Sequence, residues 1–183
     1  MLKRLFLSAA LIVGLFGVGA NSVSAQTNQT AGQSRLERQI RREILSLPYY
    51  GVFDAIGYQL NGNTVTLTGY VVRPITKSDA QGAIEDIAGI ERVVNNIEVL
   101  PLSPNDDRIR QRTLQTMVSR GGSLYRYFLG TNPSIRIIVN RGRIQLEGFV
   151  NNKGDYNLAN ILARSVPLAF GVTNNLRIIN DER

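Results

Sequence analysis

Apolar residues recur at helical spacing early in the chain and then give way to a pattern typical of strands. Four apolar residues, three or four positions apart, form one face of a predicted helix: Leu36, Ile40, Ile44 and Leu47. Ser34 and Glu37 have the spacing of a capping box, in which each side chain bonds a free backbone N–H at the start of a helix. Pro48 predicts the end of this helix, because proline lacks the N–H that a helix needs.

Two stretches rich in β-branched and aromatic residues follow, at residues 52–60 and 64–72. Both favour strands, since such side chains pack well on a pleated surface. Asn61 and Gly62 stand between the stretches, and this pair predicts a hairpin with a type I′ turn.

A second helix and a third strand complete this unit. Residues 76–79 can cap a helix that runs to about residue 88, and Gly89 suits its C-terminal end. Residues 90–100 predict a strand. The order of elements is therefore helix, strand, strand, helix, strand.

The chain then repeats this order. Three pairs of identical residues are separated by the same distance along the sequence: Gly69 and Gly148, Asn95 and Asn174, and Asn96 and Asn175. A period this long does not suit a stacked solenoid and indicates two copies of one small domain. The second copy is predicted to contain helices at 106–119 and 155–166 and strands at 134–140, 143–150 and 171–179. Its first helix aligns at a shorter spacing, with Ile109 matching Leu36, which places six extra residues within 120–133.

We therefore predict an α+β protein with two copies of an αββαβ fold, each a three-stranded mixed sheet with two helices packed on one face. The first domain is expected at residues 34–100 and the second at residues 106–180. Residues 101–105 form a linker with two prolines, which should limit the relative motion of the copies. Domains of this size bury little apolar surface, so contact between the copies can add stability.

Residues 1–25 have the pattern of a cleavable export signal. Lys3 and Arg4 precede an apolar stretch too short to span a bilayer comfortably, and small residues precede Gln26. The alternative is an uncleaved membrane anchor. Residues 26–33 are polar without apolar periodicity, and they are predicted to form a disordered lead-in.

The sequence has neither cysteine nor histidine. Without cysteine there is no disulfide framework and no lipid-acceptor residue after the signal. An exported two-domain protein of this kind suits a Gram-negative periplasm, so we expect a periplasmic protein that is not a lipoprotein. Without histidine the chain lacks the usual general base at neutral pH and the commonest metal ligand.

The sequence contains no pattern typical of a catalytic centre. Glu85 and Asp86, and likewise Asp106 and Asp107, are neighbours on predicted helices, so they point to different faces and make poor acid–base partners. No segment resembles a nucleophile elbow, a P-loop or a dinucleotide-binding fingerprint. We expect no catalytic residue, no metal site, no cofactor and no enzymatic activity.

Positive charge gathers in the second copy. Residues 26–104 hold seven basic and eight acidic residues, a net charge of −1, whereas residues 105–183 hold twelve and six, a net charge of +6. Nearly all of the basic residues are arginine, whose planar guanidinium suits phosphate and carboxylate groups. An anionic partner is therefore expected at the second copy.

Arginines and aromatic residues alternate around the extra segment of the second copy. The candidate lipid-binding residues are Arg108, Arg112, Arg120, Tyr125, Arg126, Tyr127 and Phe128. Arginine can pair with lipid phosphates, and aromatic rings favour the depth of the headgroups. One alternative is that Tyr125 and Phe128 fill the local core while the arginines form a solvated face. Another is stacking on nucleic acid, which the export signal argues against, so no nucleic-acid partner is expected.

Glycines and paired asparagines recur at matching positions in the two copies. Gly69 and Gly148 indicate a bulge or a close approach of two backbones. The asparagines are Asn95, Asn96, Asn174 and Asn175. Their amides can bind a polar ligand, or they can satisfy the backbone where the last strand begins, and the second, structural role is favoured.

These motifs resemble the BON domain, a bacterial module found singly or in pairs in osmotically induced and envelope proteins. The resemblance covers essentially the whole chain after the signal. In the first copy it rests on Val65, Leu67, Gly69, Val71, Gly89 and the asparagines, and in the second on Ile144, Leu146, Gly148, Val150 and the asparagines. The second copy departs from the pattern at residues 167–172, where it lacks the usual glycine–valine turn.

The resemblance implies an αββαβ fold, a periplasmic setting and no known catalytic centre. It also implies a role in envelope maintenance or osmotic stress tolerance, with anionic phospholipid bound through the first helix region of the second domain. The alternative is a soluble periplasmic chaperone or an adaptor for envelope proteins. The sequence leaves the oligomeric state open.

Overall fold

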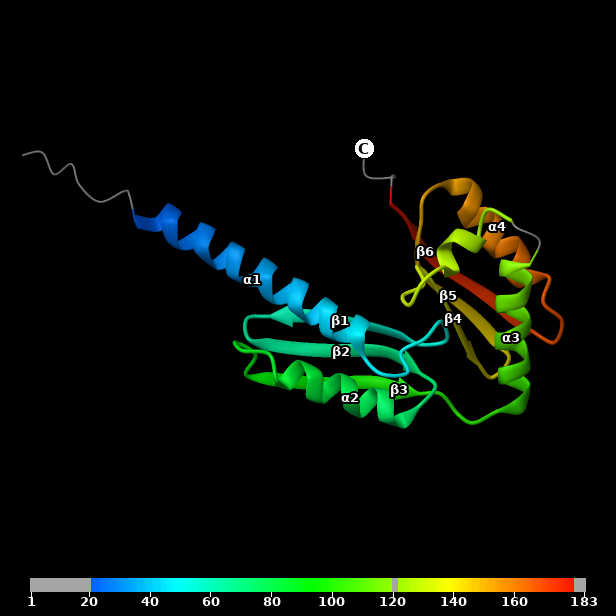
Figure 1. The fold of residues 1–183 in the computed structure, drawn as a ribbon, viewed down its shortest axis with the longest axis horizontal. Helices are drawn as coiled ribbons and strands as arrows, with labels where there is room; N and C mark the ends of the chain where they lie inside the picture. Colours follow the sequence, from blue (N-terminus) through cyan, green and yellow to red (C-terminus); the bar gives the residue numbers. More distant parts are fainter. Residues whose placement is uncertain (1–20, 120–121, 180–183) are drawn as a thin grey trace, which may run out of the picture.

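The computed structural model describes residues 21–119 and 122–179, with side chains from residue 32 onward (Figure 1). The elements are α1 (Asn21–Ser46), β1 (Ala55–Asn61), β2 (Thr64–Val71), α2 (Pro74–Glu85), β3 (Arg92–Val99), α3 (Pro104–Val118), the 3₁₀ helix η1 (Tyr125–Phe128), β4 (Ile135–Asn140), β5 (Arg143–Val150), α4 (Lys153–Arg164) and β6 (Gly171–Ile178). The predicted order of helix, strand, strand, helix, strand occurs twice.

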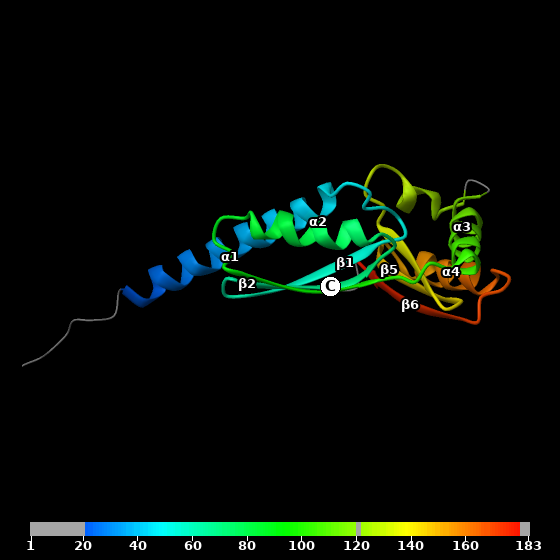
Figure 2. The ribbon, with the colours of Figure 1, turned by 90° about the horizontal axis from the view of Figure 1, so that it is seen from below.

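Each copy forms its own three-stranded mixed sheet. In the first domain, α1 to β3, strand β1 pairs antiparallel with β2, and β2 pairs parallel with β3. In the second domain, α3 to β6, strands β4, β5 and β6 pair in the same way. Figure 2 shows α1 and α2 together over one face of the first sheet. The predicted α+β fold class is confirmed.

Each domain has a core of its own, between its helices and its sheet. In the first domain, Ile40 of α1 packs with Leu67 of β2 and Ile84 of α2. In the second domain, Ile109 of α3 packs with Leu146 of β5. Alternate residues of β2 and β5 point toward the helices, as the pleat of a strand requires.

The constant spacing between the copies in the sequence holds for the later elements of each domain. The starts of β2, α2 and β3 are matched, at the same spacing as Gly69 and Gly148, by the starts of β5, α4 and β6. Every position from β2 to β3 therefore has a structural counterpart in the second domain. This correspondence allows the surfaces of the two copies to be compared residue by residue.

Helix α1 begins earlier than the sequence predicts. Residues 26–33 are helical and do not form a disordered lead-in, because α1 starts at Asn21. The predicted capping pair Ser34 and Glu37 lies inside the helix. The stretch contains no proline to stop a helix, so the turns fixed by the apolar face of α1 extend toward the N-terminus. Residues 1–20, most of the predicted export signal, lie outside the described residues.

Two local predictions in the first domain differ from the structure. Helix α2 starts at Pro74, which occupies the first helical position, and Thr76 is a buried residue of the helix instead of its cap. The loop of the first hairpin is Gly62 and Asn63, with positive φ at Gly62 alone. A type I′ turn needs positive φ at both positions, so the predicted turn type is wrong, although the hairpin is present.

The first domain packs against β4, an edge strand of the second sheet. The N–H of Ile137 donates to the carbonyl of Val52 at 2.8 Å. Arg136 donates from Nη1 to the carbonyl of Gly51 at 2.6 Å, and its guanidinium lies 4.3 Å from the centre of the Tyr50 ring. All but the last residue of β4 are buried. One face of β4 lies against its own core, and the other faces the first domain.

Candidate functional site

The extra segment of the second copy folds as η1 and is held by one carboxylate. Asp155, near the start of α4, accepts hydrogen bonds from Tyr127 Oη at 2.7 Å, Ser123 Oγ at 3.0 Å and Asn152 Nδ2 at 2.9 Å. Arg126 forms an ion pair with the same carboxylate. Asn152 caps α4 by accepting from the N–H of Asp155. The contacts fix η1 on the start of α4.

This environment changes the pKa of Asp155. Burial by itself would raise the pKa, but hydrogen bonds from Tyr127, Ser123 and Arg126, together with the charge of Arg126, outweigh it and lower the pKa below its usual value. The carboxylate is therefore held in its charged form. The counterpart of Asp155 in the first domain is Thr76, which carries no charge.

The aromatic candidates of the segment divide between core and surface. Tyr127 is buried and its hydroxyl bonds both Asp155 and the N–H of Asn151, so the prediction of a lipid-facing Tyr127 is wrong. Phe128 is partly buried and packs against the second core. Tyr125 is 49% exposed, and Leu129 beside it is also exposed. The alternation of polar and aromatic residues could not separate these roles, because Asp155 lies far along the chain.

The arginine candidates of α3 face solvent. Arg108 and Arg112, four residues apart, are exposed on one side of the helix. Arg110 lies on the opposite side, buried, where its Nη2 donates to the carbonyl of Val139 at 2.8 Å and its Nη1 pairs with Asp107. Arg120 lies outside the described residues.

The structure does not bring all of the candidates into one patch. Arg126 and Tyr125 lie beyond the C-terminal end of α3. Arg108 lies ten residues before the last residue of α3, which is about 15 Å along the helix axis. The exposed candidates therefore follow the length of α3 and η1.

The repeated asparagines make the same contacts in both domains. Asn95 donates from Nδ2 to the carbonyl of Lys77 at 3.0 Å, and its Oδ1 accepts from the N–H of Ile97 at 3.2 Å. Asn174 does the same with Tyr156 and Leu176, at 3.1 and 3.2 Å. These side chains tie the last strand of each domain to the helix before it. Asn175 donates to Glu147, and Asn96 is exposed.

The repeated glycines stand where two backbones nearly touch. A Cβ atom at Gly69 would lie 2.0 Å from the carbonyl oxygen of Ala55, and one at Gly148 would lie 1.9 Å from that of Ser134. Both glycines have positive φ, 117° and 113°. The close approach predicted from the sequence is present at both positions.

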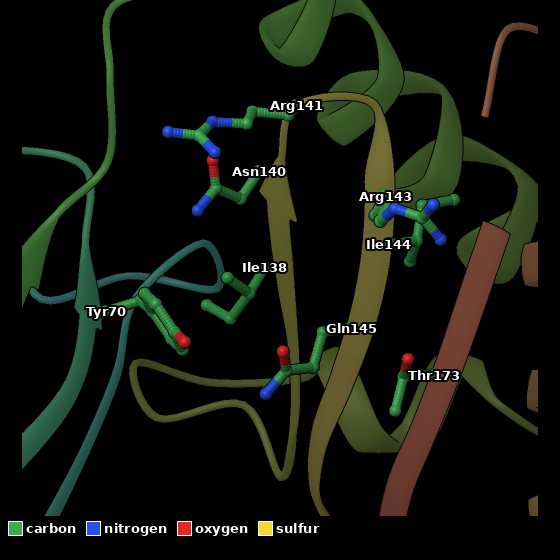
Figure 3. Close-up of a pocket in the computed structure, with 8 residues that line it drawn as sticks. All are labelled: Tyr70, Ile138, Asn140, Arg141, Arg143, Ile144, Gln145 and Thr173. Carbon is green, nitrogen blue, oxygen red and sulfur yellow. The ribbon is translucent and has the colours of Figure 1, made fainter. Parts of the chain in front are cut away.

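A cleft lies between the two domains, and the sequence did not predict it (Figure 3). Its volume is about 320 Å³, and it is lined by Tyr70, Ile138, Asn140, Arg141, Arg143, Ile144, Gln145 and Thr173. Asn140 Oδ1 is buried there without a hydrogen-bond partner among the described residues. Figure 3 shows the guanidinium groups of Arg141 and Arg143 pointing to different sides, so they do not converge on one ligand. The cleft depends on domain docking, which no local pattern indicates.

Within residues 21–119 and 122–179, no helix combines the length and the apolar character needed to cross a membrane. The described carboxylates also form no group of three that could hold a metal ion. The geometry defines a two-domain α+β protein with two three-stranded mixed sheets.

The family of the chain follows from comparison with known proteins. The family model described as BON domain matches residues 33–101 and again residues 105–180. The chain therefore belongs to the BON domain family and carries two copies of the domain.

No protein of curated function matches the chain. Among solved structures, the C-terminal domain of CdsD, the structural protein of the type III secretion system of Chlamydia trachomatis, is 11% identical, with a TM-score of 0.31, over 78% of this chain and 96% of that one. A second CdsD structure is 12% identical, with a TM-score of 0.32, over 79% and 92%. TM-scores this low carry no argument.

Proposed function

We propose that this protein is a non-enzymatic periplasmic envelope protein that binds anionic phospholipid surfaces through its second domain. In this role it supports envelope integrity or tolerance of osmotic stress. The observation that carries the proposal is the exposed Tyr125 on η1, next to Arg126, in the half of the chain, residues 105–183, that holds a net charge of +6. The association of BON domains with the envelope and with phospholipid supports the same proposal.

The charges of α3 supply most of the expected attraction. Arg108 and Arg112 are exposed, and no described carboxylate lies within ion-pair distance of either. Each such residue near an anionic surface contributes about 1 kcal/mol. Arg126 contributes less, because it shares its charge with Asp155.

Liposome flotation across a salt series tests the proposal. Vesicles with phosphatidylglycerol should carry the protein at low salt and release it as salt rises, and vesicles of phosphatidylcholine alone should not carry it. Arg108→Glu with Arg112→Glu should lower binding about tenfold or more. The matched control is Arg38→Glu with Arg42→Glu on α1, which has the same spacing and the same change of charge. Equal losses in both pairs, or no flotation of the unmodified protein, would overturn the proposal.

The second candidate is a chaperone or adaptor for envelope proteins. Strands β3 and β6 each have one neighbour in their sheet, so each presents an unpaired edge. An extended segment of another protein can add to such an edge. Capture of an unfolded outer-membrane protein, without flotation on any vesicle, would favour this function over lipid binding.

A further inference from the structure

The end of the second domain opposite η1 brings two loops together. Strand β6 begins beside the start of β5, where Gly171 pairs with Arg143. Just before it, the N–H of Phe170 donates to the carbonyl of Gly142 in the β4–β5 turn at 2.8 Å. We name this end the distal tip and define it by six residues: Arg141, Arg143, Arg164, Pro167, Leu168 and Phe170. In Figures 1 and 2 the α4–β6 loop lies at the far end of the molecule from α1.

Large apolar side chains are exposed at the distal tip. Phe170 is 75% exposed and Leu168 is 51% exposed. One face of the Phe170 ring lies on Gly142, since a Cβ atom there would stand 2.5 Å from the ring. The rest of the ring faces solvent. Single exposed apolar residues are common, but two together on one protruding loop call for an explanation.

The first domain shows that the fold does not require these side chains. At the equivalent positions of the first copy, the six residues are Gly62, Thr64, Glu85, Ala88, Gly89 and Glu91. The backbone contact is preserved, because the N–H of Glu91 donates to the carbonyl of Asn63 at 2.9 Å. One copy thus builds this end from small and acidic residues, and the other builds it from arginines and large apolar residues.

Two of the tip residues of the second domain have backbone angles that favour glycine. Leu168 has a φ of 71°, where its counterpart Gly89 has 100°. Arg141 has a φ of 52°, where Gly62 has 58°. Residues with a Cβ atom are disfavoured in this left-handed region, and glycine is not. At two positions that favour glycine, the second domain therefore has Arg141 and Leu168. This indicates that their side chains have a role beyond folding.

The distal tip carries three arginines, of which Arg141 and Arg143 also line the cleft between the domains and point to different sides (Figure 3). No described carboxylate lies within ion-pair distance of Arg141, Arg143 or Arg164. The nearby acidic residues of α3 are engaged, since Asp106 accepts from the N–H groups of Arg141 and Gly142, and Asp107 pairs with Arg110.

We propose that the distal tip enters the interface of an anionic lipid bilayer, with Leu168 and Phe170 between the headgroups and the arginines on lipid phosphates. This inference rests on the proposed lipid-binding function and assigns it a surface other than η1 and α3. A protein partner fits less well, because a stable protein interface buries about 1,200 Å² or more and the tip is two short loops. A bilayer needs only a few apolar side chains beside cationic ones.

Single tryptophan probes test which surface meets the lipid. The chain contains no tryptophan, so each variant has one reporter. Phe170→Trp probes the distal tip, Tyr125→Trp probes η1, and Glu91→Trp probes the matching loop of the first domain. Vesicles with phosphatidylglycerol should shift the emission of Phe170→Trp to shorter wavelength and allow quenching by brominated lipid, and Glu91→Trp should not respond.

The outcomes separate this inference from the proposed function. If Tyr125→Trp responds and Phe170→Trp does not, the proposal that the distal tip enters the bilayer is wrong, and lipid binding through η1 is supported. If the protein floats on anionic vesicles but neither of these probes responds, the proposal for the distal tip is also wrong. If the protein does not float at all, the proposed function fails and this inference fails with it.

Exchange of the tip residues for their first-domain counterparts gives a second test. Leu168→Gly with Phe170→Glu should lower partition onto anionic vesicles about tenfold or more, because two apolar side chains no longer leave water. Arg141→Gly with Arg143→Thr should lower it about tenfold. The control is Ile75→Ser, which removes a half-exposed apolar residue from the first domain. Binding within twofold of the unmodified protein in both tip variants would overturn the inference, provided circular dichroism shows them folded.

Discussion

At the scale of single residues, the strictest demands on side-chain size are at Gly69 and its counterpart Gly148. We expect Gly69→Ala to lower the free energy of unfolding by about 3 kcal/mol or more, because its Cβ would overlap the carbonyl of Ala55 and φ is positive. Gly82→Ala in α2 is the control, since nothing lies within 4 Å of its Cβ position, and it should add about 0.5–1 kcal/mol. Urea denaturation measures both changes. A loss below about 1 kcal/mol for Gly69→Ala would show that β1 moves aside easily.

At Leu168, in contrast to Gly69, we expect that a substitution will not lower the stability of the protein. Leu168→Gly removes about 1–2 kcal/mol of left-handed strain and adds about 0.5–1 kcal/mol of glycine entropy, so stability should stay level or rise slightly. Thermal and urea unfolding of the variant check this. A loss above about 2 kcal/mol would mean that Leu168 packs for stability, and it would weaken the case for the distal tip as a binding surface.

At the scale of elements, the carboxylate of Asp155 joins η1 to α4 and makes their contact depend on pH. A lowered folded pKa stabilises the folded state above the ordinary value of about 3.9, and this contribution is lost as pH falls through the folded pKa. The difference in urea midpoint between pH 7 and pH 3 should therefore be smaller in Asp155→Asn than in the unmodified protein. Glu85→Gln, at an exposed carboxylate, controls for the loss of one charge. An unchanged difference in Asp155→Asn would refute the role of the carboxylate.

The periodic elements were predictable because their signals are repeats that can be seen in the sequence itself. The apolar face from Leu36 to Leu47 identified α1, and the spacing from Gly69 to Gly148 identified two copies of one fold. The start of α1 was missed because the polar residues before Ser34 carry no apolar period, although nothing in them stops a helix.

The candidate site was less predictable, because burial there depends on distant residues. Tyr125 and Tyr127 look equivalent in sequence, and the hydrogen bond to Asp155 distinguishes Tyr127 as the interior one. The pair Asn152 and Asp155 has the spacing of a helix cap, which was the one available signal of a polar anchor at that point. Arg141 gave no signal, and the departure from the family pattern at residues 167–172 did not reveal that Leu168 has a positive φ, which is visible only in the structure.

At the scale of the whole molecule, Arg136 fixes the first domain on the second. It is 6% exposed, and burial lowers its pKa, while Tyr50 and Asp54 of the first domain oppose that effect. Its guanidinium stays charged at neutral pH. The hydrogen bond to Gly51 and the contact with the Tyr50 ring both cross between domains.

We expect Arg136→Met to destabilise the protein by about 2–3 kcal/mol and to loosen the docking of the domains, because a charged hydrogen bond is lost. Small-angle scattering should show a broader range of shapes, and protease should cut residues 48–54 faster. Arg177→Met is the control, since Arg177 lies over Phe149 within one domain, 4.6 Å from its ring centre. Identical behaviour of the two variants would contradict a role for Arg136 in docking.

The double covering of β4 also bears on how this protein can be dissected. Ile138 and Arg136 are buried on the side of the strand that faces the first domain. If the chain were cut at the linker, Ile138 and Arg136 in the second half would become exposed to water, and the edge of β4 would be unpaired. The two domains are thus not interchangeable modules. A fragment that contains only the second domain would tend to associate through the exposed face and edge of β4, and its properties would differ from those of the same domain in the full chain.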